Sequence, residues 1–200
     1  IQEELFTSGR NIPNIDPSLE IWHWPIAVYL FLGGLAAGIL FFGALIYILG
    51  KEDTYPTAVK SASIIPPIAL SLGLLALVYD LTHPLYTWQL YTTFRIESPM
   101  SWGAWVLLIT TPLSFLWTFS YYREVYPKLE AKLKIFNRFN FLKIVEKFTI
   151  KNRKNIANAL IPLALILGVY TGILLSAFNA RPLWNNAILG PLFLVSGLST

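Results

Sequence analysis

The sequence predicts an all-α integral membrane protein, with a four-helix transmembrane bundle over Pro25–Phe178 and the start of a fifth helix. Of its 200 residues, 55% are hydrophobic and only 13% are charged, which is not the composition of a soluble domain. Four stretches of 19 or more residues carry no formal charge, and a helix needs about 20 residues to cross the hydrocarbon core. These stretches are continuously apolar rather than alternating, which favours helices over a β-barrel.

The uncharged stretches set the positions of the predicted spans. They lie between Glu20 and Lys51, Lys60 and Asp80, Glu97 and Arg123, and Lys154 and Arg181. We therefore expect spans near Pro25–Ile48, Ala62–Leu81, Ser101–Tyr122 and Ile156–Phe178. Gly34 and Gly38 in the first span form a Gly-x-x-x-Gly pattern, which lets helices approach closely in lipid. Prolines inside the other three spans are expected to bend them and to free backbone carbonyls: Pro66, Pro67, Pro112 and Pro162.

Three segments follow from this division. Residues 1–24 form an N-terminal segment outside the membrane, 25–178 form the bundle with a basic loop at 123–155, and 179–200 form a connection and the start of a second bundle. A weak internal repeat supports the last assignment, because a shift of 163 residues places Leu30–Ala37 on Phe193–Thr200 and Gly34 on Gly197. The sequence therefore predicts the first half of a duplicated two-bundle fold.

The basic residues predict the orientation of the protein. The loop Arg123–Lys154 carries ten Lys and Arg residues, and the first loop adds two more, whereas the other side of the membrane has three. By the positive-inside rule, the N-terminus lies outside a cell inner (cytoplasmic) membrane, which the protein spans several times. The basic, aromatic loop would also suit a helix lying on anionic lipid. No nucleic-acid partner is expected, since topology already explains basic residues that flank spans.

The unusual polar residues converge on the outer face of this topology. They are His23 and Tyr29 on the first span, Asp80 and His83 at the end of the second, Arg95, Ser98 and Trp102 before or at the start of the third, and Tyr170 in the fourth. Ionisable groups at membrane depth usually mark a pathway or site. If the helix continued past Asp80, His83 would share its face, but Pro84 follows and favours a helix end there. The alternatives are a solvated Asp–His helix end and, for His23 between two tryptophans, an interfacial aromatic belt.

Residue counts limit the cofactors that this protein can hold. Without cysteine it can neither ligate an iron–sulfur cluster through thiolates nor form a disulfide, and no metal site is predicted. Two histidines are too few for several haems, and a di-haem cytochrome b would require histidine pairs at both membrane faces. We therefore expect no haem or metal in this chain.

Several motifs resemble those of a known family. The stretch "DLTHPLYTWQLYTTFRIESPMSWGAW" is similar to the Asp-Leu-Gly-Arg-Pro … Ser-Pro-Met-Ser-Trp-Gly stretch of the NrfD/polysulfide-reductase membrane-subunit family. The segments "VYTGILLSAFNARPLWNNAILGPLFLVSGLST" and "WHWPIAVYLFLGGLAAG" resemble the family's fourth and first spans. The sequence departs from the family at Ile26 and Tyr29, where it has no Asn or His, and at His83, where the family usually has arginine.

The resemblance implies a function. Members of this family bind a quinone (menaquinone or similar) near the outer face, and there they meet a four-cluster iron–sulfur subunit and a molybdopterin catalytic subunit. The resemblance places Tyr170 at the quinone. Our hypothesis from the outer-face residues adds His23 or Tyr29 as a partner from the first span, Asp80 and His83 as a proton relay, and Arg95, Ser98 and Trp102 in support. The chain is then expected to be the quinol-oxidising subunit of a polysulfide or sulfur reductase, whose terminal chemistry lies on a partner. The alternatives are a purely structural anchor of such a complex and a proton- or ion-translocating, transporter-like protein.

Overall fold

The structure is a computed structural model that describes residues 24–81, 87–92, 98–121, 141–176 and 186–199, and within these residues every regular element is a helix. Four helices are long and apolar enough to cross a membrane: α2 (Trp24–Ile48), α3 (Pro56–Asp80), α5 (Pro99–Ser120) and α9 (Arg153–Ser176). Three shorter helices are α4 (Gln89–Thr92), α8 (Phe141–Lys151) and α10 (Leu189–Ser199). The predicted all-α bundle of four spans and a further helix is therefore confirmed, and the molecule is a multi-pass membrane protein.

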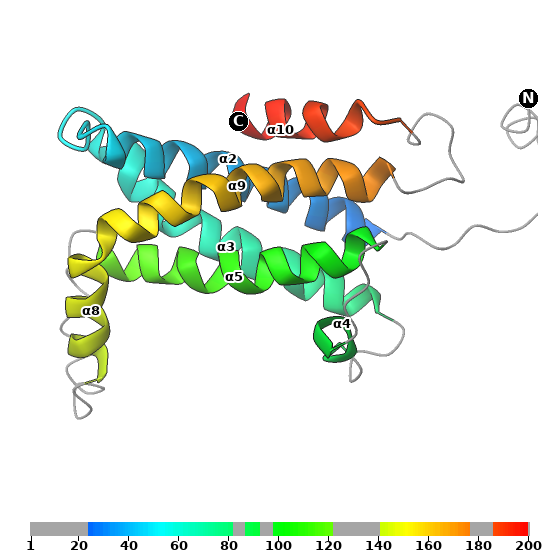
Figure 1. The fold of residues 1–200 in the computed structure, drawn as a ribbon, viewed down its shortest axis with the longest axis horizontal. Helices are drawn as coiled ribbons and strands as arrows, with labels where there is room; N and C mark the ends of the chain where they lie inside the picture. The colour runs from blue at the N-terminus through cyan, green and yellow to red at the C-terminus, as the bar shows by residue number, and fades with distance from the viewer. Residues whose placement is uncertain (1–23, 82–86, 93–97, 122–140, 177–185, 200) are drawn as a thin grey trace, which may run out of the picture.

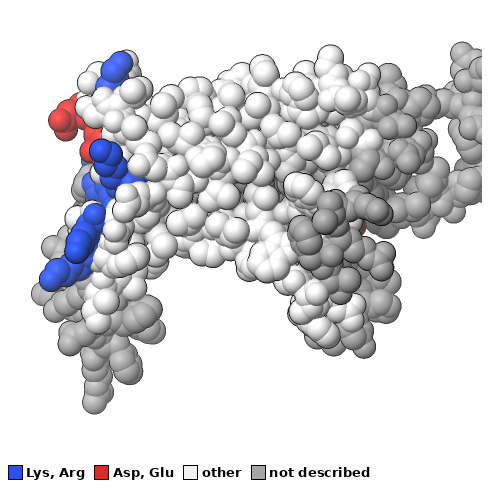
Figure 2. Space-filling view, viewed as in Figure 1, with Lys and Arg blue, Asp and Glu red and all other residues white. Residues whose placement is uncertain are grey.

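The four spans lie side by side along the long axis of the molecule (Figure 1). Each overlaps its predicted range and differs from it by a few residues at most at the ends, except that α3 begins six residues earlier, at Pro56. In Figure 2, charged side chains gather at one end of the bundle, which we call the charged end, while the body of the spans is white. Because α2 and α5 begin at the opposite end and α3 and α9 finish there, that end holds those predicted site residues that the structure describes.

Helix α2 is the centre of the packing. It contacts α3, α9 and α10, while α5 packs against α9 and α3. Small residues allow this close approach, since a Cβ added at Gly43 would lie 2.3 Å from the Cβ of Ala62 on α3. Large apolar side chains fill the remaining interior, among them Leu40, Leu160 and Leu167. In lipid, this van der Waals packing replaces the hydrophobic effect as the force that joins helices.

Helix α10 packs against the predicted Gly-x-x-x-Gly pattern of α2. A Cβ added at Gly38 would lie 1.7 Å from the carbonyl oxygen of Gly197, and one added at Gly197 would lie 2.8 Å from the carbonyl oxygen of Gly34. The two backbones are therefore in direct contact, which only glycine permits at positions 38 and 197. Gly34 and Gly197 are also the residues that the internal repeat aligns, so the two matching segments pack against one another.

A proline pair in α3 shows how the bundle satisfies freed backbone groups. Pro67 has no N–H to donate to the carbonyl of Ser63, four residues earlier. The Thr118 hydroxyl of α5 donates a hydrogen bond to that carbonyl instead. Ser63 is fully buried, so without Thr118 its carbonyl would lack this partner in a water-free interior. The expected freeing of a carbonyl by proline is thus observed, together with its replacement partner.

Side chains from three elements meet at the charged end. The Tyr121 hydroxyl, directly after α5, donates a hydrogen bond to Glu52 in the first loop. The Arg153 guanidinium of α9 lies 4.0 Å from the centre of the Tyr121 ring and also donates to the Ser120 carbonyl. Burial, together with the hydrogen bond to Glu52, raises the pKa of the Tyr121 phenol, although Arg153 partly offsets this. The cluster joins the first loop to the ends of α5 and α9.

Candidate functional site

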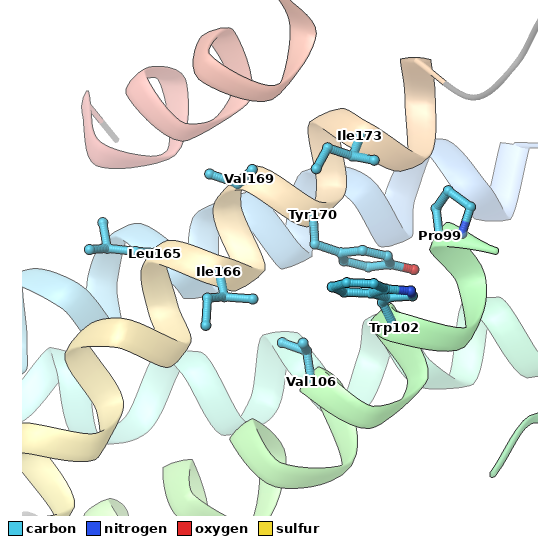
Figure 3. Close-up of a pocket in the computed structure, with 8 residues that line it drawn as sticks. All are labelled: Pro99, Trp102, Val106, Leu165, Ile166, Val169, Tyr170 and Ile173. Carbon is cyan, nitrogen blue, oxygen red and sulfur yellow. The ribbon is translucent and has the colours of Figure 1, made fainter. Parts of the chain in front are cut away.

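An apolar pocket of about 480 Å³ lies between α5 and α9, toward the end of the bundle opposite the charged end. Its lining comes from two helix faces: Pro99, Trp102 and Val106 of α5, and Leu165, Ile166, Val169, Tyr170 and Ile173 of α9. The size is within the range of pockets that take small molecules, about 300–1,000 Å³. Tyr170 and Trp102 supply the polar groups of a lining that is otherwise aliphatic (Figure 3). Such a pocket suits a largely apolar ligand that carries a few polar atoms.

Tyr170 reaches from α9 across the pocket to α5. Figure 3 shows its ring extending toward α5 with the hydroxyl at the Pro99 end, near the indole of Trp102. The tyrosine is 7% exposed, so the surrounding helices hold it in place. Trp102, by contrast, is 52% exposed, because its ring forms part of the wall that opens away from the bundle interior. The pocket thus has a fixed phenol and an indole that can be covered by a ligand.

Gly103 makes room for this phenol. A Cβ added at Gly103 would lie 1.8 Å from Tyr170 Cζ and 2.0 Å from its hydroxyl oxygen, far inside any van der Waals contact. The end of the Tyr170 ring therefore rests on the backbone of α5, at the glycine of "SPMSWG". The glycine in this motif has a steric role: it sets how deeply the phenol enters.

Tyr29 of α2 stands next to Tyr170. It is only 2% exposed, and its hydroxyl makes no hydrogen bond of standard geometry among the described residues. The Tyr170 phenol lies within hydrogen-bonding reach of it, and the phenol of Tyr91 on α4 acts on it electrostatically. A buried hydroxyl whose hydrogen bonding is incomplete is destabilising by about 1–3 kcal/mol. Such a hydroxyl can form a hydrogen bond with a ligand oxygen.

The structure brings several of the predicted site residues to one end of the bundle. Tyr29 and Tyr170 are adjacent, Trp102 lines the pocket, and Ser98 is the half-buried residue before α5. Asp80 is the last residue of α3 and is half-buried at the same end. The other three predicted residues, His23, His83 and Arg95, lie outside the described residues.

The helical spacing of Asp80 and His83 does not place them on one face. Helix α3 ends at Asp80, and Leu81 has an extended conformation with φ −71° and ψ 126°. The helix thus stops three residues before His83, as expected with Pro84 close behind. Any contact between the two side chains would depend on the connection after α3 and not on an i, i+3 relation.

Two features of the site were not predicted. Tyr91 belongs to a four-residue helix, where neither length nor periodicity gives a signal, and its ring is placed by an edge contact with Trp105 at 6.4 Å. The aliphatic wall of the pocket was also missed, because spans that are apolar all round do not reveal which face borders a cavity. Gly103 could have been noticed, since a glycine next to tryptophan at a helix start allows close approach by another side chain.

Among the described residues, no group of three or more His, Cys, Asp and Glu side chains could hold a metal ion. The polar atoms near the pocket are phenol oxygens and the indole nitrogen of Trp102, which exchange hydrogen bonds rather than bind metals strongly. The site therefore fits an amphipathic organic ligand with hydrogen-bonding oxygens.

Comparison with known proteins identifies relatives over most of the sequence. The family described as "Polysulphide reductase, NrfD" matches residues 12–200. A polysulfide reductase subunit of Wolinella succinogenes is 34% identical over 181 residues, which are 90% of this protein and 55% of the relative. Protein NrfD of Escherichia coli is 33% identical over 184 residues, covering 90% and 57% of the two proteins. A protein NrfD homolog of Haemophilus influenzae is 29% identical over 199 residues, covering 94% and 59%.

The chain spans 55–59% of the length of these three relatives. The family match includes all four spans, the pocket between α5 and α9, and α10. The resemblance seen in the sequence motifs is thereby confirmed. The protein belongs to the NrfD/polysulfide reductase family of membrane subunits.

Proposed function

We propose that this protein is the quinone-binding membrane subunit of a polysulfide or sulfur reductase complex, and that it oxidises quinol near the outer face of the membrane. The observation that carries the proposal is a pair of neighbouring buried phenols: Tyr170 lines an apolar pocket, and beside it the Tyr29 hydroxyl makes no hydrogen bond of standard geometry among the described residues. A quinol ring has apolar faces and two oxygens, and it supplies two electrons and two protons on oxidation. A largely aliphatic pocket lined by Trp102 and Tyr170, with the Tyr29 phenol beside Tyr170, matches these requirements.

Each residue has a proposed role. Tyr170 and a partner on the first span, Tyr29 or His23, hold the ring oxygens through hydrogen bonds. Trp102 covers a ring face, and Ser98 and Arg95 support the start of α5. Asp80 at the end of α3, with His83, accepts the released protons and passes them to the outer solvent. A nearby carboxylate can shift the pKa of a histidine into the pH range in which it takes up and releases protons.

Electrons leave the protein by tunnelling to a partner subunit. The sequence has no cysteine for an iron–sulfur cluster, so the proposed acceptor is a four-cluster iron–sulfur subunit that serves a molybdopterin catalytic subunit. The relative from Wolinella succinogenes carries the name of a polysulfide reductase, which supports the proposed substrate class. The positive-inside bias favours a cytoplasmic position for the charged end and an outer position for the pocket end.

The test uses the complete complex, purified in mild detergent. Quinone is extracted and quantified, and quinol-linked polysulfide reduction is measured for the unsubstituted protein, Tyr170→Phe and Tyr29→Phe. Loss of one hydrogen bond to the ring, about 1 kcal/mol, should weaken quinone binding about fivefold in each variant. Tyr55→Phe is the control, because Tyr55 is exposed at the opposite end.

The outcomes separate the proposal from its alternatives. A smaller amount of bound quinone per complex, together with slower quinol oxidation by an intact complex, would support the quinone role. Full activity in both tyrosine variants would remove these residues from the site. A complex that assembles normally but holds no quinone would favour a purely structural anchor.

A further inference from the structure

Helix α8 lies across the end of the bundle instead of along it. Figure 1 shows it running crosswise to α5 and α9 at the charged end, and it contacts both of these helices. Asn152 forms the corner with α9: its backbone N–H and its side-chain amide both donate to the Phe148 carbonyl, at 3.0 and 3.1 Å. Its own carbonyl accepts a bond from the N–H of Ile156 at 2.9 Å. Asn152 thus bonds to the last turn of α8 and to the first turn of α9.

One side of α8 is held by the protein. Thr149 is fully buried, and its hydroxyl donates to the Glu146 carbonyl at 2.9 Å. Helix α8 also contacts α5 and α9. Among the described side chains of α8, Ile144, Lys147, Phe148, Ile150 and Lys151 are exposed.

The open side combines apolar and basic residues. Ile144 and Phe148, four residues apart and thus on one face, are 65% and 55% exposed. Lys147 and Lys151 are also exposed and also four residues apart, so they form an adjoining basic row. In Figure 2, the basic side chains lie along the outer rim of the charged end, away from the white body of the spans.

We propose that α8 is a binding site for anionic phospholipid at the membrane surface of the charged end. A helix in this position lies in the plane of the membrane, at the level where the spans end. Ile144 and Phe148 then enter the boundary between head groups and acyl chains, and Lys147 and Lys151 contact the phosphates. Helices that rest on membranes have this arrangement of an apolar face beside lysines. The proposal depends on the spans and not on what the pocket binds.

The exposed lysines beside the apolar residues of α8 favour anionic lipid over other occupants of this surface. The described part of the charged end also exposes Lys51, Lys60 and Lys154, and its basic residues outnumber its acidic ones, which are Glu52 and Asp53 in the first loop and Glu146 on α8. Anionic head groups are the partner that meets both features at once, since a single lipid offers an acidic phosphate and apolar chains. A purely apolar protein surface would leave the lysines without counter-charge, and a soluble anion would leave Ile144 and Phe148 in water.

The first experiment measures lipid-dependent stability. The full-length protein in its complex is placed in nanodiscs of phosphatidylglycerol or phosphatidylcholine, and the unfolding temperature is compared. The difference should be several degrees in favour of phosphatidylglycerol and should fall to half or less in the Lys147→Gln/Lys151→Gln variant. The matched control, Lys51→Gln/Lys60→Gln, removes the same charge at the same end and should keep the difference. Equal differences in both variants would overturn the proposal.

The second experiment measures how deeply the two faces of α8 lie in the membrane. Because this sequence has no cysteine, Phe148→Cys and Lys147→Cys each add one thiol to it for a fluorescent label, and the labelled unsubstituted complex gives the background from partner subunits. In phosphatidylglycerol nanodiscs, the label at 148 should be quenched by acyl chains that carry a nitroxide, and the label at 147 mainly by iodide in the water. Quenching of the label at 148 by iodide alone would place α8 in solvent. Protection from both quenchers would show that a protein partner covers it, and either result would overturn the proposal.

Discussion

The phenol of Tyr170 on α9 rests on the backbone of Gly103 on α5, where a Cβ would lie 1.8 Å from its Cζ atom. This contact joins α5 and α9, the two helices that form the pocket, and it sets how closely the Tyr170 ring approaches the backbone of α5. The Tyr170 phenol that lines the pocket is therefore positioned by a residue that has no side chain.

Gly103→Ala should displace the Tyr170 ring into the adjoining pocket, because the ring end is the part that can move. Since the pocket offers about 480 Å³, we expect the protein to fold, with a stability change within about 1 kcal/mol. Quinone binding should weaken about fivefold or more as the phenol leaves its place and fills part of the pocket. The measurement is the dissociation constant of a quinone analogue in detergent, beside thermal unfolding.

Gly34→Ala is the matched control for that variant. It makes the same change inside a helix, but a Cβ at Gly34 meets nothing within 4 Å. Unchanged affinity in Gly34→Ala and reduced affinity in Gly103→Ala are expected. Equal affinities in the two variants would separate the Tyr170–Gly103 contact from ligand binding.

Tyr29→Phe should have opposite effects on stability and on binding. Removal of a buried hydroxyl that makes no hydrogen bond of standard geometry among the described residues should raise the free energy of unfolding of the ligand-free protein by about 1 kcal/mol. It should also weaken quinone binding, if the ligand supplies the missing partner. Tyr121→Phe is the comparison, because that hydroxyl already bonds Glu52, so its loss should lower stability. A destabilised Tyr29→Phe protein would mean that this hydroxyl is already satisfied without ligand.

The spans could be predicted from sequence because charge is costly in hydrocarbon, so gaps between charged residues mark them directly. The close approach of another helix to α2 could be anticipated from Gly34 and Gly38, because small residues at this spacing let the backbones of membrane helices come close together. The pocket could not be predicted. Its walls are aliphatic residues of α5 and α9 that look the same in sequence whether they face lipid, a neighbouring helix or a cavity.

The candidate site was predicted in part. Tyr29 and Tyr170 are 141 positions apart in the sequence, and they could be brought together only by assigning both to the same end of antiparallel spans. The relation between Asp80 and His83 could not be settled by spacing, because it depends on where α3 ends, and the helix ends at Asp80. The position of Tyr91 could not be predicted from sequence, because it depends on where the short helix α4 lies in the structure.

The Tyr121 phenol should make stability depend on pH in the alkaline range. Burial and the hydrogen bond to Glu52 raise its pKa in the folded protein, whereas in the unfolded protein it titrates near pH 10. The folded state therefore holds this proton more tightly, so the stabilisation is fully present below about pH 10 and is lost as the pH rises above it. The unfolding temperature of the unsubstituted protein should fall between pH 8 and pH 10.5 by more than that of Tyr121→Phe. Tyr55→Phe, which removes an exposed phenol, should follow the unsubstituted protein.

Thr118→Val should destabilise the bundle by about 1 kcal/mol, because it removes the hydroxyl that bonds the Ser63 carbonyl freed by Pro67. Thr118→Ser keeps the hydroxyl and is the control for the change in shape. The decisive comparison adds Pro67→Ala, which gives α3 a backbone N–H able to bond Ser63 within the helix. In that background, Thr118→Val should lose less stability than in the unsubstituted protein, as measured by thermal unfolding in detergent. If the two losses were equal, the Thr118 hydroxyl would act through some other contact, such as its 3.0 Å bond to the Ser114 carbonyl, and not by replacing the donor that Pro67 lacks.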